Sequence, residues 1–103
     1  MKVFETSLLD CLILEPNIFR DSRGFFLETF RSNQFTEDTG IRDVFVQDNH
    51  SHSSKGVFRG LHFQLNNPQG KLVRASRGKV LDVAVDLRTE SKTFGQSEVF
   101  EIS

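Results

Sequence analysis

Polar side chains that could bind and deprotonate a ligand gather between positions 45 and 64 of the sequence. Gln47 and Asn49 precede a run of serine, lysine and glycine that is typical of a turn, and Arg59 and His62 follow it. Amides and a guanidinium supply hydrogen-bonding groups, and an imidazole with an ordinary pKa of about 6.5 is largely a free base at neutral pH. This stretch therefore predicts a polar ligand site with one candidate proton acceptor, His62.

The spacing alone leaves a structural role open for each of these residues. A lone histidine in an apolar strand is more often a hydrogen-bonded core residue than a catalyst. Arg59 could equally form a surface ion pair of little energetic value. Gln47 and Asn49 could satisfy backbone groups at the end of a strand.

The elements that must position these groups are short and rich in β-structure. Glycine recurs between alternating runs, which is the pattern of strands joined by tight turns. We expect strands at residues 25–30, 44–49, 57–65, 72–76, 79–87 and 97–102. We also expect one short helix over residues 32–39, with Ser32 or Asn33 as its N-cap and Gly40 at its end.

Alternation along the expected strands predicts which side chains share a face. In residues 79–87 one face carries Asp82 and Ala84, and in residues 44–49 one face carries Gln47 and Asn49. Faces that mix small, polar and aromatic groups suit the lumen of a small ligand-binding barrel. Strict alternation would place Arg59 and His62 on opposite faces, so we expect a β-bulge or an equivalent bend at the intervening Gly60.

Composition bounds the class of protein. The 103 residues fit one domain, and 13 basic residues nearly balance 14 acidic ones, which argues against nucleic-acid or membrane-surface binding by bulk charge. Cys11 is the one cysteine, so no internal disulfide forms, and the apolar run of residues 11–14 is too short to span a membrane. We expect a cytoplasmic protein.

The chain ends on the strand expected at residues 97–102, so we also expect a C-terminally truncated domain with an open edge.

Several motifs in register resemble the dTDP-4-dehydrorhamnose 3,5-epimerase family. They are VQDNHS at 46–51, GVFRGLHFQ at 56–64, RGFFLE at 23–28, GKLVR at 70–74 and LDVAVDLR at 81–88. The resemblance covers the whole chain and implies an all-β, cupin-like double-stranded β-helix, that is, a jelly-roll barrel. It implies a homodimer without cofactor or metal, which epimerises C3 and C5 of a dTDP-4-keto-6-deoxy sugar in the synthesis of dTDP-L-rhamnose.

The resemblance also implies roles for individual residues. His62 matches the family's base, and Lys71 matches the cation that stabilises the enolate beside the C4 ketone. Arg59 matches the phosphate ligand. The remaining substrate-binding positions are matched by Arg23, Phe26, Glu28, Gln47, Asp48 and Asn49. The family's tyrosine acid and the aspartate that orients its histidine have no matching position, and the sequence contains no Tyr.

Three rival functions remain open on the sequence. A related enzyme on the same scaffold could epimerise one carbon only or isomerise the ketone. The chain could instead bind a dTDP-sugar without catalysis. His50 and His52 are spaced like ligands of a metal-binding cupin, but no Glu follows within the next few residues, so we predict no metal site.

Overall fold

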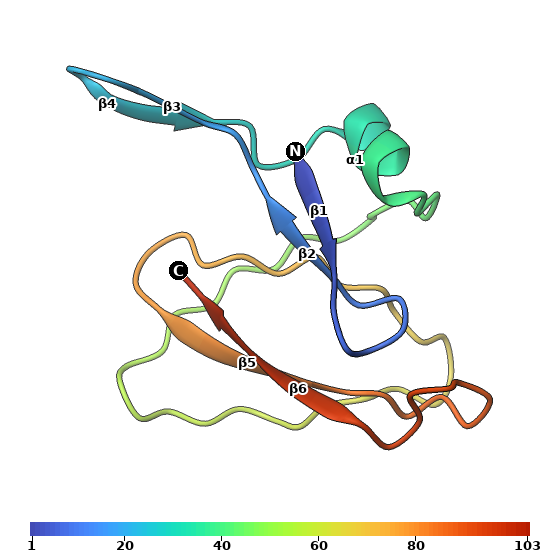
Figure 1. Ribbon diagram of the computed structural model, residues 1–103. Coiled ribbons are helices and arrows are strands. Elements are labelled where there is room, and N and C mark those ends of the chain that lie inside the picture. The colour runs from blue at the N-terminus through green and yellow to red at the C-terminus, as the bar shows by residue number, and fades with distance from the viewer. The chain divides into compact units, whose positions relative to one another are not determined.

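The computed structural model describes all residues from 1 to 103 and contains one helix and six strands. In chain order the elements are β1 (Lys2–Glu5), β2 (Leu12–Glu15), β3 (Ile18–Asp21), β4 (Gly24–Leu27), α1 (Ser32–Thr39), β5 (Val80–Val85) and β6 (Ser97–Ile102) (Figure 1). The chain divides into two compact units. Residues 1–42 and 84–98 form the first unit, and residues 43–83 and 99–103 form the second.

Two antiparallel hairpins open the first unit. In the β1–β2 hairpin Val3 pairs with Leu14, and in the β3–β4 hairpin Phe19 pairs with Phe26. Sequence alternation predicted one strand over residues 25–30, but β4 begins at Gly24 and ends at Leu27. The prediction was too long because the partner strand β3 has only four residues with which to form a ladder.

The helix α1 has the bounds that the sequence predicts, but a different N-cap. The carbonyl of Arg31 accepts the first helical hydrogen bond, from the amide of Phe35 at 2.9 Å, and Arg31 has extended backbone angles. Arg31 is therefore the N-cap, and the prediction of Ser32 or Asn33 was wrong because both already lie inside the helix. Gly40 ends the helix as predicted, with φ at 75° and its amide bonded to Thr36 O at 2.9 Å.

The apolar core of the first unit is small. Leu8 and Phe35 are the buried apolar side chains of the structure, with exposed fractions of 4% and 5%. Phe35 packs against Phe30 with the ring centroids 5.6 Å apart and the planes tilted by 53°. The helix α1 contacts β1, so burial of Phe35 fixes the helix beside the first hairpin.

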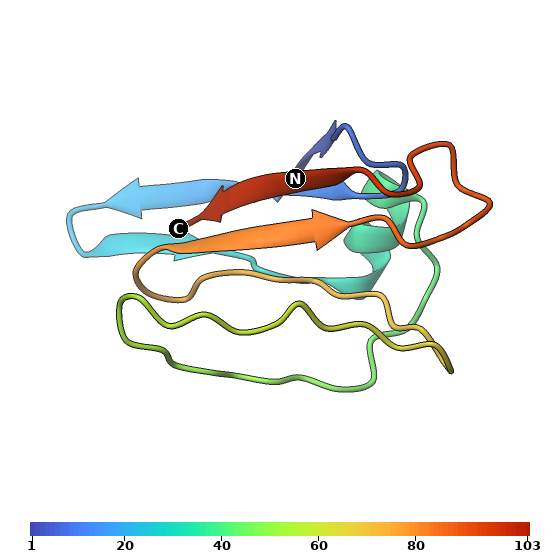
Figure 2. The same cartoon turned by 90° about the horizontal axis from the view of Figure 1, so that it is seen from below.

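The strands β5 and β6 pair with each other and run in opposite directions (Figure 2). Both were predicted, β6 with its observed bounds and β5 within the expected residues 79–87. The amide of Asp86 donates to Gln96 O at 3.0 Å and that of Gly95 to Asp86 O at 2.7 Å, which closes the connection between the strands. Within β5, Asp82 and Ala84 are half-buried while Leu81 and Val83 are exposed, so in the middle of the strand the face that carries Asp82 and Ala84 is the more covered one.

The middle of the second unit is not assigned to strands. Strands were predicted at residues 44–49, 57–65 and 72–76, and these predictions were wrong for this structure. The chain runs out along residues 44–52, turns at Lys55–Gly56 and returns along residues 57–65 (Figure 2). The amide of Val57 bonds to Ser54 O at 3.2 Å to close the turn, but no backbone ladder joins the two arms. Without ladder hydrogen bonds an extended backbone is not a β-strand.

A β-bulge or an equivalent bend was predicted at Gly60, and the bulge is absent because a bulge interrupts a ladder and none forms here. Gly60 nevertheless leaves the extended region, with φ at 107°.

No helix of the structure is long and apolar enough to cross a lipid bilayer.

Candidate functional site

Arg59 is held by the arm of the chain that precedes the turn. Its Nε donates to the hydroxyl of Ser53 at 2.9 Å, and its Nη2 donates to the backbone carbonyl of His52 at 3.2 Å. These contacts bridge six and seven positions of sequence across the turn at Lys55–Gly56. The guanidinium is therefore oriented by the protein while its side chain remains exposed.

His62 lies against Gly60. A β-carbon built on Gly60 would stand 3.4 Å from the backbone nitrogen of His62 and 3.5 Å from its Nδ1 atom. Both separations are ordinary van der Waals distances, so a methyl group at position 60 would touch the imidazole without displacing it. The φ of 107° at Gly60 favours glycine, so the backbone conformation at this position affects where His62 is placed.

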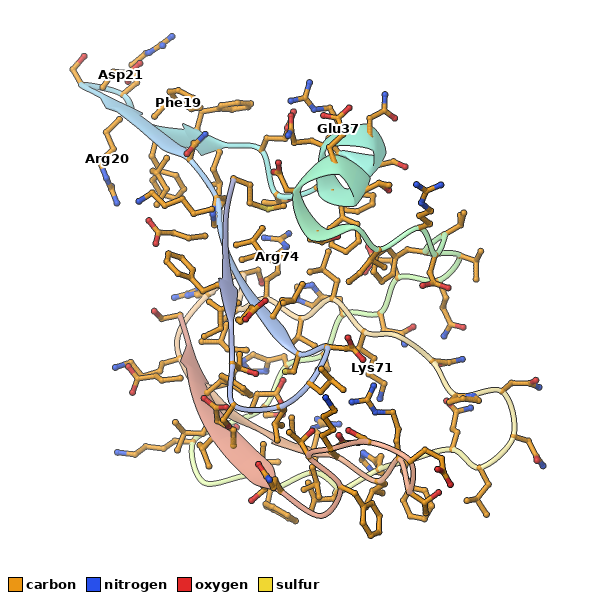
Figure 3. The ribbon with its side chains drawn as sticks, turned by 45° about the vertical axis from the view of Figure 1, so that its right-hand side comes forward. Phe19, Arg20, Asp21, Glu37, Lys71 and Arg74 are labelled. Atoms are coloured by element: carbon orange, nitrogen blue, oxygen red, sulfur yellow. The ribbon has the colours of Figure 1, made fainter.

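The polar residues of the arm before the turn contact one another. The side-chain amide of Gln47 donates to Oδ1 of Asn49 at 3.1 Å, which confirms that these two side chains share a face. Asp48, between them, is exposed. Lys71 and Arg74 extend from the segment that follows Gly70, and both are exposed (Figure 3).

The N-terminal candidates lie on and beyond the β3–β4 hairpin. Arg23 donates from Nη2 to Oδ2 of Asp21 at 2.6 Å, and this hydrogen bond lowers the pKa of the Asp21 carboxyl and raises that of Arg23. Asp21 lies at the tip of the hairpin (Figure 3). Glu28 forms an ion pair with Arg31 at 3.0 Å. Phe26 is 68% exposed, so its ring is free to stack on a planar ligand.

The nine candidate residues fall into both compact units. The first unit contains Arg23, Phe26 and Glu28, and the second contains Gln47, Asp48, Asn49, Arg59, His62 and Lys71. All nine are exposed. The direct contact that the structure places between two of them joins Gln47 to Asn49. The first unit has one surface hollow lined by residues 8–11 and 84–88 and another lined by residues 5–6, 8–12, 39 and 41, and no candidate residue lines either of them.

Sequence reasoning overlooked a polar network in the first unit. Asp86 is buried, and its carboxylate accepts hydrogen bonds from Nε of Arg88 at 2.9 Å and from the hydroxyls of Ser91 and Thr93 at 2.5 and 2.6 Å. These hydrogen bonds hold the pKa of Asp86 far below its ordinary range, and the bond from Arg88 has the largest effect. Asp86 in turn raises the pKa of Arg88. The signal was present: an Asp-x-Arg sequence followed closely by Ser and Thr is typical of a side-chain-stabilised turn.

The arrangement of possible metal ligands was also compared with what a metal site requires. No group of three or more His, Cys, Asp or Glu side chains is positioned to hold a metal ion.

Comparison with known proteins identifies the chain's relatives. The sequence profile of the dTDP-4-dehydrorhamnose 3,5-epimerase family matches residues 5–103. The enzyme of that name from Salmonella typhimurium is 58% identical over 97 residues, which are 93% of this chain and 53% of the relative. The match thus includes nearly all of this chain but only about half of the Salmonella enzyme.

Solved structures give the same result. The dTDP-6-deoxy-D-glucose-3,5-epimerase of Legionella pneumophila, in complex with dTDP-4-keto-L-rhamnose, is 49% identical with a TM-score of 0.94. The alignment covers 99% of this chain and 54% of that one. The Bacillus anthracis 3,5-epimerase with TDP and PPi bound is 45% identical with a TM-score of 0.92, over 99% of this chain and 59% of that one.

These matches define the class and then the family. The chain is a strand-rich protein with one helix, and its structure matches about half of a dTDP-sugar epimerase. It belongs to the dTDP-4-dehydrorhamnose 3,5-epimerase family. It spans about half the length of these relatives.

Proposed function

We propose that this protein acts in the epimerisation of dTDP-4-dehydro-6-deoxy-D-glucose at C3 and C5, giving dTDP-4-dehydro-L-rhamnose. The observation that supports this most is the TM-score of 0.94 to an epimerase solved with dTDP-4-keto-L-rhamnose bound. The proposal also includes the fold and assembly of the protein, which would be a homodimer of cupin-like jelly-roll barrels. The enzyme would act in the cytoplasm, where it would help to make a sugar nucleotide for cell-surface polysaccharide.

The chemistry requires a base, a cation and an acid. The C4 ketone acidifies the protons on C3 and C5, and removal of either places negative charge on the ketone oxygen. We assign proton removal to His62, an exposed imidazole, and stabilisation of the enolate to Lys71. Return of a proton to the opposite face of the carbon needs an acid. The sequence contains no Tyr to supply a phenol for this step.

Binding of the nucleotide sugar is assigned to the other candidates. Arg59 would contact the diphosphate, because a planar guanidinium pairs with phosphate oxygens in bidentate geometry. Hydrogen bonds with Gln47, Asp48 and Asn49 would fix the sugar and its linkage, the carboxylate of Asp48 as an acceptor. On the β3–β4 side, Phe26 would stack on the thymine, with Arg23 and Glu28 as polar contacts to the nucleotide.

Deuterium exchange from solvent into C3 and C5 of the substrate tests this proposal directly. Wild-type protein and the His62→Ala variant are incubated with the substrate in deuterated water, and NMR follows both positions. His52→Ala is the matched control, because it removes a nearby exposed imidazole but keeps the backbone carbonyl that accepts a hydrogen bond from Arg59. Exchange at both carbons that is lost in His62→Ala and kept in His52→Ala supports the double epimerase with His62 as base.

Other outcomes select another function. Label at one carbon only identifies a mono-epimerase or a ketoisomerase. No exchange by a protein that still binds dTDP identifies a nucleotide-sugar-binding chain without catalysis. Loss of exchange in both histidine variants would refute the assignment of His62.

A further inference from the structure

The contacts of Arg59 leave one edge of its guanidinium unoccupied. A guanidinium presents its N–H donors in a fixed planar fork. Nε and Nη2 form one side of that fork, and they are engaged by Ser53 Oγ at 2.9 Å and by the His52 carbonyl at 3.2 Å. The end of the fork, formed by Nη1 and the second hydrogen of Nη2, makes no hydrogen bond within the structure. That edge has the geometry that binds two phosphate oxygens.

We propose that Ser53 is a positioning residue, which holds the side edge of the Arg59 guanidinium so that its end edge is presented to the diphosphate of a nucleoside diphosphate sugar. This inference deepens the proposed function and depends on the assignment of Arg59 to the diphosphate. The hydroxyl of Ser53 does not itself contact the ligand in this arrangement.

The hydrogen bond from Ser53 should matter for affinity because the Arg59 side chain is exposed. An unrestrained arginine loses much rotamer freedom when it binds, and that loss weakens affinity. Here the guanidinium is already fixed by two acceptors from the opposite arm of the turn, so less freedom remains to be lost. Ser54, the next residue, is also an exposed serine, but its side chain makes no such contact.

Calorimetric titration with dTDP and with inorganic pyrophosphate tests the proposal. Ser53→Ala is expected to raise the Kd of both ligands by about three- to tenfold, as for loss of one net hydrogen bond. Ser54→Ala is the matched control and should bind like wild type. Ser53→Thr keeps the hydroxyl and should restore most of the affinity. Thymidine, which lacks the diphosphate, should bind all of these variants equally.

A double-mutant cycle separates positioning from a general effect on the turn. In an Arg59→Gln background, removal of the Ser53 hydroxyl should change the Kd for dTDP no further, because there is no guanidinium to position. An unchanged Kd in Ser53→Ala, an equal loss in Ser54→Ala, or an undiminished effect in the Arg59→Gln background would each overturn the proposal.

The exchange assay keeps this proposal distinct from the proposed function. A protein that exchanges no substrate protons, but whose pyrophosphate affinity still depends jointly on Ser53 and Arg59, refutes the epimerase and supports the positioning role. A protein that exchanges substrate protons, but whose pyrophosphate affinity does not depend on Ser53, supports the epimerase and refutes the positioning role.

Discussion

Nη1 of Arg88 lies 2.7 Å from Oδ2 of Asp10, although 78 positions separate the two residues in the chain. The same guanidinium donates from Nη2 to the carbonyl of Leu9 at 2.7 Å and from Nε to Asp86 at 2.9 Å. Arg88 therefore fastens the loop between β1 and β2 to the connection between β5 and β6. These polar contacts join segments that are far apart in the sequence, in a unit whose buried apolar side chains are Leu8 and Phe35.

Removal of the Asp86 carboxylate should destabilise the protein markedly. Asp86→Ala leaves Arg88, Ser91 and Thr93 without their shared acceptor, so we expect the Tm to fall by at least about 5 °C. Thermal unfolding followed by circular dichroism measures this change. Asp43→Asn, an exposed carboxylate, is the control and should shift the Tm little. A Tm in Asp86→Ala equal to that of the control would show that the network is dispensable.

Stability should decline in acid, and Asp86 should account for part of that decline. Its pKa is lowered on folding, so the unfolded chain binds a proton first as the pH falls. The contribution of Asp86 is thus complete above the unfolded pKa of about 4 and is lost progressively below it. Urea titrations between pH 7 and pH 2.5 should give a shallower acid decline for Asp86→Asn than for wild type. Parallel pH profiles would contradict the assignment.

Phe35 should be the costliest apolar side chain to truncate. It is 5% exposed and packs on Phe30, so Phe35→Ala should lower the free energy of unfolding by about 3 kcal/mol. Phe19, which is 62% exposed on β3, is the control, and its truncation should cost less than about 0.5 kcal/mol. Equilibrium unfolding in urea measures both values. Equal costs would mean that Phe35 is not the centre of this core.

Gly60→Ala should impair catalysis more than binding, provided that His62 is the base. A φ of 107° is strained for alanine, so the backbone that leads to His62 would shift, whereas the added methyl group would itself stand in ordinary van der Waals contact with the imidazole at 3.5 Å. We expect kcat to fall about 10- to 100-fold through misplacement of the base. Gly78→Ala introduces comparable strain, at a φ of 79°, with nothing within 4 Å, and should leave kcat near wild type. Comparable kcat losses in both variants would exclude a specific effect on His62.

The sequence predicted those elements whose signals are local. Alternation marked β5 and β6, and Gly40 marked the end of α1, because a left-handed C-cap favours glycine over other residues. The strands β1, β2 and β3 were missed because their sequences, KVFE, LILE and IFRD, are short and do not alternate regularly between apolar and polar residues. The strands expected between residues 44 and 76 were wrong because alternation identifies an extended chain but not its hydrogen-bonding partner.

The candidate site was predictable to a similar degree. Residue types and family motifs pointed to Arg59 and His62, and the amide pair of Gln47 and Asn49 shares a face as expected. Ser53 was not found, because its contact with Arg59 depends on how the turn folds one arm toward the other. The turn that begins at Asp86 has a local sequence signal, but the convergence of five donors on its carboxylate does not, because it arises only when the β5–β6 connection has formed.

Every residue from 42 to 74 is exposed, among them Val46, Phe58 and Leu65 with exposed fractions of 90%, 79% and 86%. Water therefore hydrates this apolar surface in the free protein. Whatever covers it, whether a nucleotide base, further polypeptide or another subunit, must release that water. The heat capacity of association should consequently be negative, and the binding enthalpy should become more favourable as the temperature rises.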